Sequence, residues 1–244
     1  MRKLICVLAL LLPGMALAAG GNVHLDKANY DLSDKASLQR GAKLFMNYCL
    51  GCHGQQYQRY QRTFNDLGIP EELAEENLQF TGDKISDYIE RSMPAESAAQ
   101  WFGAAPPDLT LVARVRGADW IYTYLRSFYV DESRPFGVNN TVFPEVGMPH
   151  VLQPLQGTPR MVEEEAMVDG ETVMRHAGIK TDGDGALTTE EYDQAILDLV
   201  NYLEYTGEPF RLESESIGKW VLIFILVLFV FVFMLKKEFW RDVH

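Results

Sequence analysis

The sequence predicts a mainly α-helical, exported domain that is anchored by one C-terminal transmembrane helix. Three observations support this prediction. The chain opens with a segment typical of a secretory signal, two amphipathic helical patterns follow, and a long uncharged run lies near the end. The part between signal and anchor, residues 19–216, is long enough for one domain with a hydrophobic core, or for a small domain with long insertions.

Residues 1–18 are predicted to be a cleaved signal peptide. Two basic residues precede a short apolar run, which ends in the small-residue sequence Ala-Leu-Ala. The run before Pro13 is short for a membrane span, so a retained N-terminal anchor is the weaker alternative. The mature chain would begin near Ala19 and would lose Cys6.

Residues 217–235 are predicted to form the transmembrane helix, because Lys219 is the only charged residue among them. At 1.5 Å per residue this stretch is about 28 Å long, close to the roughly 30 Å of a hydrocarbon layer. A buried core helix is the alternative, but the run has no polar face. Lys and Arg residues in the tail, 236–244, place that tail in the cytoplasm by the positive-inside rule. The domain 19–216 is therefore expected in the periplasm, on a bacterial inner membrane.

The charge balance argues against nucleic acid as a partner. The chain has 22 basic and 34 acidic residues and a net charge of −12, which a polyanion would repel. Acidic runs at 71–76 and 163–165 are expected to be solvated surface. Steering of a cationic protein partner is the alternative function for these runs.

The motif that carries chemistry is Cys49-Leu50-Gly51-Cys52-His53. In an oxidising compartment a Cys-x-x-Cys pair fits a disulfide or a redox pair, but neither use requires the histidine. Cys-x-x-Cys-His is the attachment signature of a c-type haem, in which the thiols bond the porphyrin and the imidazole ligates iron. A tetrahedral zinc site would need a second pair of soft ligands at similar spacing. We therefore predict one covalent haem c, held by Cys49, Cys52 and His53.

A helical pattern precedes this motif. Its apolar residues repeat at helical spacing: Leu38, Ala42, Phe45 and Cys49. A helix from about Ser37 would thus deliver Cys49 from its apolar face. Gly41 inside this helix costs ~1 kcal/mol relative to alanine, which indicates close helix packing at that position.

A second helix is predicted late in the chain. Its apolar residues have the same spacing: Tyr192, Ile196, Leu199 and Leu203. Thr188 and Glu191 form a capping box at its start, and Gly207 marks its end. Two helices that bracket a haem motif resemble the class I cytochrome c plan, in which the first and last helices cross.

The sixth ligand of the iron decides between electron transfer and oxygen chemistry, because a methionine thioether closes the metal to substrates. Most methionines are packing residues. Two methionines stand before a proline: Met93, forty residues after His53, and Met148, ninety-five after it. Spacing alone leaves the choice open, or favours Met93.

Four blocks of the chain resemble cytochrome c1 of the bacterial and mitochondrial bc1 complex. They are CLGCHGQQYQRY, WFGAAPPDLTLVARVRGADWIYTYL, FPEVGMPHVL and YDQAILDLVNYLEYTGEP, and a single span follows them. The resemblance runs from about Leu38 to the end, and its second and third blocks are far more specific than the haem motif. It implies a class I cytochrome c-like haem domain with long insertions.

The resemblance also implies roles for individual residues. The methionine of the third block is the distal haem ligand in that family, and the matching residue here is Met148. An arginine of the second block pairs with a haem propionate, and the match falls on Arg114, with Arg116 as the neighbouring alternative. A guanidinium suits this role because it holds a buried carboxylate through two hydrogen bonds.

As a function, the resemblance implies electron relay without bond-making in a substrate, so the chain would not be an enzyme on its own. The haem would take single electrons from the Rieske iron-sulfur protein and pass them to a soluble cytochrome c, beside cytochrome b in a dimeric complex. One alternative is a membrane-tethered c-type cytochrome that donates directly to a terminal oxidase. Another is a haem enzyme or gas sensor with an open distal side.

Two further features are assigned ordinary roles. Residues 180–191 resemble a calcium loop, but its first ligand position is Lys180 and Glu191 already serves the capping box. His150, beside the third-block methionine, is expected to be a surface or hydrogen-bonded histidine rather than a ligand.

Overall fold

The computed structural model describes residues 23–168 and 171–242. The predicted signal peptide, 1–18, and Cys6 lie outside the described residues. About half of the chain is helical. The helices within the described ranges are α2 (Lys35–Leu44), the π-helical turn η1 (Phe45–Cys49), α3 (Tyr60–Leu67), α4 (Glu71–Asn77), α5 (Ala95–Phe102), α6 (Val112–Arg116), α7 (Ala118–Arg126), α8 (Gln153–Gln156), α9 (Thr189–Gly207) and α10 (Arg211–Phe239). The strands described are paired as three antiparallel ribbons: β1 (Gln55–Arg59) with β2 (Tyr88–Ile89), β3 (Phe128–Val130) with β4 (Val138–Asn140), and β5 (Pro159–Val168) with β6 (Glu171–Thr181).

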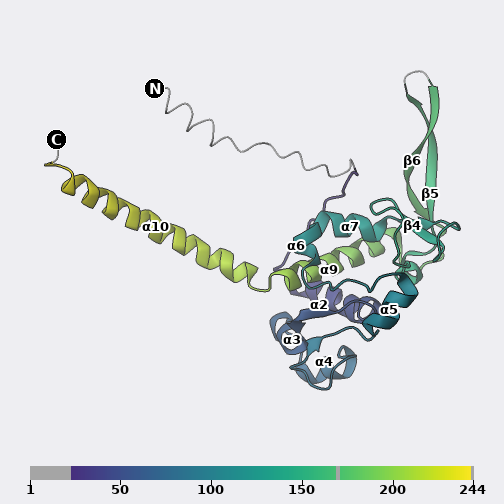
Figure 1. Cartoon of the computed structure of the whole chain (residues 1–244), viewed down its shortest axis with the longest axis horizontal. Coiled ribbons are helices and arrows are strands. Elements are labelled where there is room, and N and C mark those ends of the chain that lie inside the picture. The colour runs from purple at the N-terminus through teal and green to yellow at the C-terminus, as the bar shows by residue number, and fades with distance from the viewer. Residues whose placement is uncertain (1–22, 169–170, 243–244) are drawn as a thin grey trace.

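The body is organised around α9, which packs against α2, α6, α7 and α8. Helices α2 and α9 lie in the middle of the body, α6 and α7 lie on one side of them, and α3 and α4 lie on the other (Figure 1). The predicted capping box of α9 is confirmed. Thr188 Oγ1 accepts from the Glu191 amide at 3.2 Å, and the Glu191 carboxylate accepts from the Thr188 amide at 2.9 Å. The helix ends at Gly207, as predicted.

The close packing predicted at Gly41 is also confirmed. A Cβ at this position would lie 2.0 Å from the main-chain oxygen of Asp198 and 2.8 Å from Cβ of Tyr202. Both groups belong to α9, so the backbones of α2 and α9 touch where the glycine leaves room. The glycine of α2 therefore allows a contact between the two helices that a side chain would prevent.

A buried carboxylate reinforces this crossing. Asp198 is 2% exposed, and it accepts hydrogen bonds from Arg40 Nε at 2.6 Å and from Ser37 Oγ at 2.6 Å. Asn201 in turn donates to Ser37 Oγ at 2.5 Å. A buried charge is costly unless it is paired and hydrogen-bonded, and both conditions are met here. The network holds α2 in register with α9.

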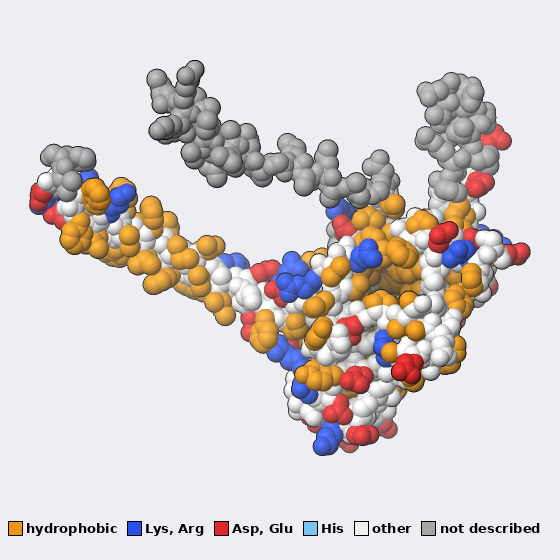
Figure 2. All heavy atoms as spheres, in the orientation of Figure 1, with side chains coloured by type: hydrophobic (Ala, Val, Ile, Leu, Met, Phe, Trp, Pro, Cys, Tyr) orange, Lys and Arg blue, Asp and Glu red, His pale blue; other side chains and the backbone are white. Residues whose placement is uncertain are grey.

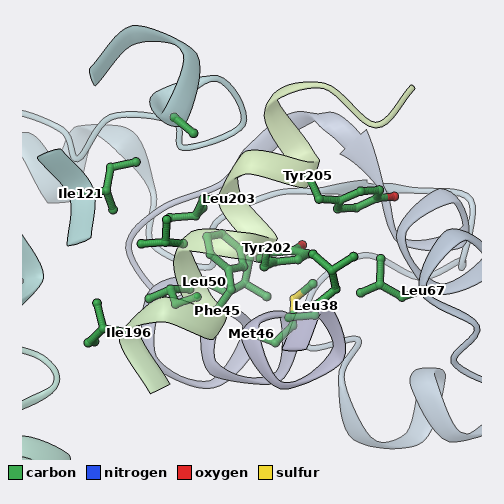
Figure 3. Packing of buried hydrophobic residues seen from close by; sticks show 14 of the residues in the cluster. Leu38, Phe45, Met46, Leu50, Leu67, Ile121, Ile196, Tyr202, Leu203 and Tyr205 are labelled. Atoms are coloured by element: carbon green, nitrogen blue, oxygen red, sulfur yellow. The ribbon is translucent and has the colours of Figure 1, made fainter. Parts of the chain in front are cut away.

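The core between these helices is apolar and aromatic. Phe45, Leu50 and Met46 pack against Tyr202 and neighbouring side chains of α9 (Figure 3). The rings of Phe45 and Tyr202 are 5.6 Å apart. The predicted apolar faces are confirmed, because seven of the eight residues named for them are buried and Cys49 is half-buried.

The first helix differs from its prediction in one respect. It begins at Lys35, where Asp34 caps it by accepting from the Ser37 amide at 3.0 Å, but it is α-helical only as far as Leu44. Residues 45–49 form a π-helical turn, in which the Leu50 amide donates to the Phe45 carbonyl at 3.0 Å. Such wide turns are frequent at functional sites, and this one leads directly into the haem motif.

The hairpin of β5 and β6 was not predicted. It projects away from the body as a two-stranded ribbon (Figure 1). The acidic run 163–165 lies on it and is exposed, and the acidic residues of 71–76 are exposed on α4. The prediction that these runs are surface is thus confirmed.

The last helix, α10, extends from the body as a long rod with hydrophobic side chains along its length (Figures 1 and 2). It is long and apolar enough to cross a membrane, and it exceeds the predicted span 217–235 at both ends. Three residues, 208–210, separate it from α9. Two contacts hold this connection against the body. Arg211 Nη1 donates to the Tyr30 hydroxyl at 2.8 Å, and the Arg62 guanidinium lies 4.1 Å from the centre of the Phe210 ring.

The packing at Gly41 leads to a prediction about stability. Replacing Gly41→Ala should lower the free energy of unfolding by about 2 kcal/mol, because overpacking against a backbone costs roughly 3 kcal/mol and helix propensity returns about 1 kcal/mol. Urea unfolding of the detergent-solubilised protein, followed by circular dichroism, measures the change. Gly218→Ala is the matched control, since a Cβ there meets nothing within 4 Å. An equal effect of the two substitutions would contradict the close contact.

Candidate haem site

The attachment motif lies at the end of the π-helical turn. Cys49 and Cys52 are half-buried, unpaired thiols, and the His53 amide donates to the Cys49 carbonyl at 2.8 Å. Burial, aided by the neighbouring Cys52, raises the pKa of Cys49 to about 12. The motif is therefore one compact turn that holds two neutral thiols and an imidazole next to each other.

The imidazole of His53 is buried and oriented. Its Nδ1 lies 2.7 Å from the Pro107 carbonyl, which can only accept, so Nδ1 carries the proton. The opposite nitrogen, Nε2, keeps a free lone pair. Burial lowers the pKa of His53 below its usual value and so favours the neutral form that ligates metals. A hydrogen bond of this kind fixes the tautomer and the ring direction of a metal-binding histidine.

Two segments contact the motif through backbone hydrogen bonds. The Met93 amide donates to the Gly51 carbonyl at 3.0 Å, and the Leu109 amide donates to the Gly54 carbonyl at 2.9 Å. Gly54 favours this close fit, since a Cβ there would lie 3.1 Å from the Arg91 amide nitrogen, a tight contact. Arg91 also donates to the Pro106 carbonyl at 2.9 Å, which joins the two bracing segments to each other.

Met148 lies in the loop between β4 and α8 and is half-buried. Its side chain packs against the small cluster of Phe128, Val138 and Val146. The Tyr124 hydroxyl donates to Met148 Sδ at 3.4 Å. Burial raises the pKa of Tyr124, so its hydroxyl stays a donor at neutral pH. The thioether is thus presented by α7 and the β3–β4 ribbon rather than by the attachment motif.

The other methionines have different surroundings. Met93 is bonded through its backbone to the attachment motif itself. Met46 is buried in the core between α2 and α9, and Met234 is exposed on α10. Met161 and Met167 lie on the projecting hairpin.

The two arginines singled out in the sequence lie in different places. Arg114 packs its side chain against Gly207, and its Nη1 donates to the Gly207 carbonyl at a long 3.5 Å. Arg116 lies 4.9 Å over the Trp120 ring, which stacks on Tyr124 at 4.8 Å. Both are exposed.

His150 is hydrogen-bonded, as one of the two expectations had it, but it is not on the surface. It is 7% exposed, stacks on Phe128 at 4.7 Å and pairs through Nε2 with Gln156 Oε1 at 2.6 Å. Burial lowers its pKa to about 4. It serves to hold the chain that follows Met148 against β3.

The carboxylates of the calcium-like loop have other partners. Thr158 donates to Asp184 from its amide at 2.6 Å and from its hydroxyl at 2.7 Å, and Arg160 pairs with Asp182 at 2.8 Å. Glu191 accepts from the Thr188 amide. These contacts connect the base of the hairpin to the start of α9.

The residues of this region fit a c-type haem. Two thiols, a neutral imidazole with a free nitrogen and a thioether are the donor set that such a group uses. Figure 2 shows a hollow lined with hydrophobic side chains on the body, between the positions of α7 and α5 in that view. An apolar hollow suits a flat, largely apolar macrocycle.

Sequence reasoning missed two contributors to the site. Pro107 offers its carbonyl to His53, a role that a backbone oxygen performs without any signature of residue type. Tyr124 meets Met148 across 24 positions of the chain, and no spacing rule connects a loop methionine with a tyrosine of α7. This contact becomes visible only in the structure, where α7 packs beside the loop that carries Met148.

Comparisons with known proteins identify the family of the whole chain. The model of the cytochrome C1 family matches residues 26–243. The chain is 53% identical to cytochrome c1 of Allochromatium vinosum over the whole of both chains. It is 44% identical to a Nitrosomonas europaea protein named ammonia monooxygenase gamma subunit, over 100% of this chain and 99% of that one. Cytochrome c1 of Rhodospirillum rubrum is 29% identical over 96% of this chain and 97% of its own length.

The family match covers nearly all of the described chain, and it includes the attachment motif, the Met148 loop and the C-terminal helix. Members of the family are electron-transfer haem subunits of the bc1 complex. This chain therefore belongs to the cytochrome c1 family.

Proposed function

We propose that the protein is a membrane-anchored, mono-haem cytochrome c1 that relays single electrons from the Rieske iron-sulfur protein to a soluble cytochrome c. The observation that supports this proposal is that His53 and Met148, the iron ligands that we propose, come from separate elements of the fold. His53 comes from the attachment turn at the α2–α9 crossing, whereas Met148 comes from a loop held by α7 and β3. Ligands from two independent elements can close an iron on both faces and leave it only electrons to exchange.

The chain's own residues attach and orient the group. Cys49 and Cys52 supply the thiols for two thioether bonds to one haem c, which would make the attachment covalent. The Pro107 carbonyl holds the His53 ring so that Nε2 would be free to ligate the iron of a bound haem. When bound, the haem supplies the one-electron chemistry, cycling between ferric and ferrous iron. The protein makes no bond in a substrate.

Met148 is the better candidate for the distal ligand than Met93. The Met93 backbone is hydrogen-bonded to Gly51, in the same turn as the proximal histidine. A residue bonded to that turn lies beside the proximal ligand, whereas the distal ligand must approach the opposite face. Met148 meets this requirement because other elements of the fold present it.

For the propionate we propose Arg114, with Arg116 as its alternative. The guanidinium of Arg114 is exposed, and its Nη1 contacts the Gly207 carbonyl at 3.5 Å, at the edge of hydrogen-bond range. Such a weak contact is easily exchanged for a carboxylate. Arg116 instead makes cation–π contacts with Trp120 at 4.9 Å and Phe143 at 5.9 Å.

We further propose that residues 1–18 are removed, that 19–216 lie in the periplasm and that 217–235 cross the inner membrane, with 236–244 in the cytoplasm. The basic residues of the tail support this orientation. Beside cytochrome b in a dimeric complex, the exposed face of α10 would meet protein as well as lipid.

The partners can be tested by purification. Tagged full-length protein, extracted from its own membranes in mild detergent, should bring cytochrome b and the Rieske protein with it, identified by mass spectrometry. The same preparation should contain one haem per chain by mass. Recovery of a terminal oxidase without cytochrome b would instead support the tethered-donor alternative.

The distal ligand can be tested with a pair of variants. Met148→Leu should abolish the near-infrared sulfur-to-iron charge-transfer band of the oxidised protein and should let the reduced protein bind carbon monoxide. Met93→Leu, the matched control, should leave both properties unchanged because Met93 lies beside the proximal turn. The reverse pattern would assign the ligand to Met93.

The propionate partner can be tested through the midpoint potential. Arg114→Gln should lower the equilibrium constant for reduction about tenfold, because a charge-assisted hydrogen bond is worth roughly 1.5 kcal/mol and an unpaired carboxylate favours ferric iron. Arg116→Gln should change the potential less. A larger effect from Arg116→Gln in redox titration would transfer the role to that residue.

A further inference from the structure

The Tyr124 hydroxyl and the Met148 sulfur form a contact that the proposed electron relay does not by itself require. The hydroxyl donates to Sδ at 3.4 Å, which is within range for a sulfur acceptor. Ligation needs only one lone pair of a thioether, and the second lone pair is free to accept a hydrogen bond. Tyr124 is therefore placed to act on the iron through its ligand.

The tyrosine is held firmly in this position. Its ring stacks on Trp120 at 4.8 Å with an interplanar angle of 9°, and it meets Phe128 edge to face at 5.2 Å. Its main-chain carbonyl accepts from Asn140 Nδ2 at 2.8 Å, which connects α7 to β4. Since rings and backbone are both fixed, the hydroxyl has a defined direction.

The Met148 side chain is also held by apolar packing. Met148 packs on the cluster of Phe128, Val138 and Val146, and two positions later His150 stacks on Phe128. Phe128 therefore contacts both Tyr124 and the chain that follows Met148. Because the Tyr124 hydroxyl and Met148 Sδ both belong to side chains that pack on the Phe128 cluster, this packing fixes the distance between them.

We infer that Tyr124 is a positioning residue that raises the reduction potential of the haem by hydrogen-bonding the sulfur of its distal ligand. This inference rests on the proposed ligation by Met148. A hydrogen bond withdraws electron density from the sulfur, and ferric iron depends on that density more than ferrous iron does. The bond thus disfavours the oxidised state.

The test is Tyr124→Phe in the full-length haem protein. This substitution keeps the stacking ring and removes only the donor. The equilibrium constant for reduction should fall roughly two- to fivefold, as expected for a weak neutral hydrogen bond. This fall corresponds to about 20–40 mV at 59 mV per tenfold for one electron. The charge-transfer band should shift but persist, and the thermal midpoint should change little.

Tyr122→Phe is the matched control. Tyr122 lies on the same helix and is half-buried, but its ring lies against Arg126, with the guanidinium carbon 4.4 Å from its centroid. This variant should leave the potential and the band unchanged. A potential that moves equally in both variants would show a general effect of α7 and would overturn the inference.

Failure of the inference can be told from failure of the proposed ligand. If Met148→Leu abolishes the band and Tyr124→Phe leaves the potential unchanged, the ligand stands and the role of Tyr124 is wrong. If Met148→Leu retains the band, Met148 is not the ligand, and the inference falls with it. Loss of the band in Met148→Leu with a lowered potential in Tyr124→Phe supports both.

Discussion

The rest of the structure depends on the contact between α2 and α9 at Gly41. With no side chain at this position, the α9 backbone at Asp198 approaches α2 directly, and the buried Asp198 carboxylate ties the two helices through Ser37 and Arg40. Burial of this charge is tolerable because three side chains donate hydrogen bonds to it: Ser37 and Arg40 of α2 and Gln194 of α9. The two helices therefore cross in one register, and this register fixes the positions of the segments that follow them or pack on them.

The register between α2 and α9 determines where the haem motif lies. A wide π-helical turn follows α2 directly, so Cys49, Cys52 and His53 are placed relative to α9 with no intervening loop. From the other side, α7 packs on α9 and carries Tyr124 towards Met148. His53 and Met148, the two iron ligands that we propose, are thus far apart in sequence but share α9 as a common reference. A small movement of that helix would alter both sides of the site together.

Much of the fold and part of the site follow from sequence, for physical reasons. The helical spacing of apolar residues and the capping residues identify α2 and α9, because both signals are local in sequence. Gly41, a glycine in the apolar face of α2, indicates close packing. The ribbon of β5 and β6 escaped prediction, because the side chains of β5 that the structure describes are mostly exposed, and exposed residues impose no alternation of apolar and polar types. The π-helical turn, the Pro107 carbonyl and the Tyr124 hydroxyl escaped as well, since each depends on contacts between distant segments.

The joint between α9 and α10 has a consequence for how the molecule exchanges electrons. Only residues 208–210 separate the central helix of the body from the anchor, and the pairs Arg211 with Tyr30 and Arg62 with Phe210 stiffen this connection. So short a connection restricts how far the body can move relative to the anchor. In the relay that we propose, the carriers that deliver and remove electrons would therefore have to travel to a haem that stays near the membrane.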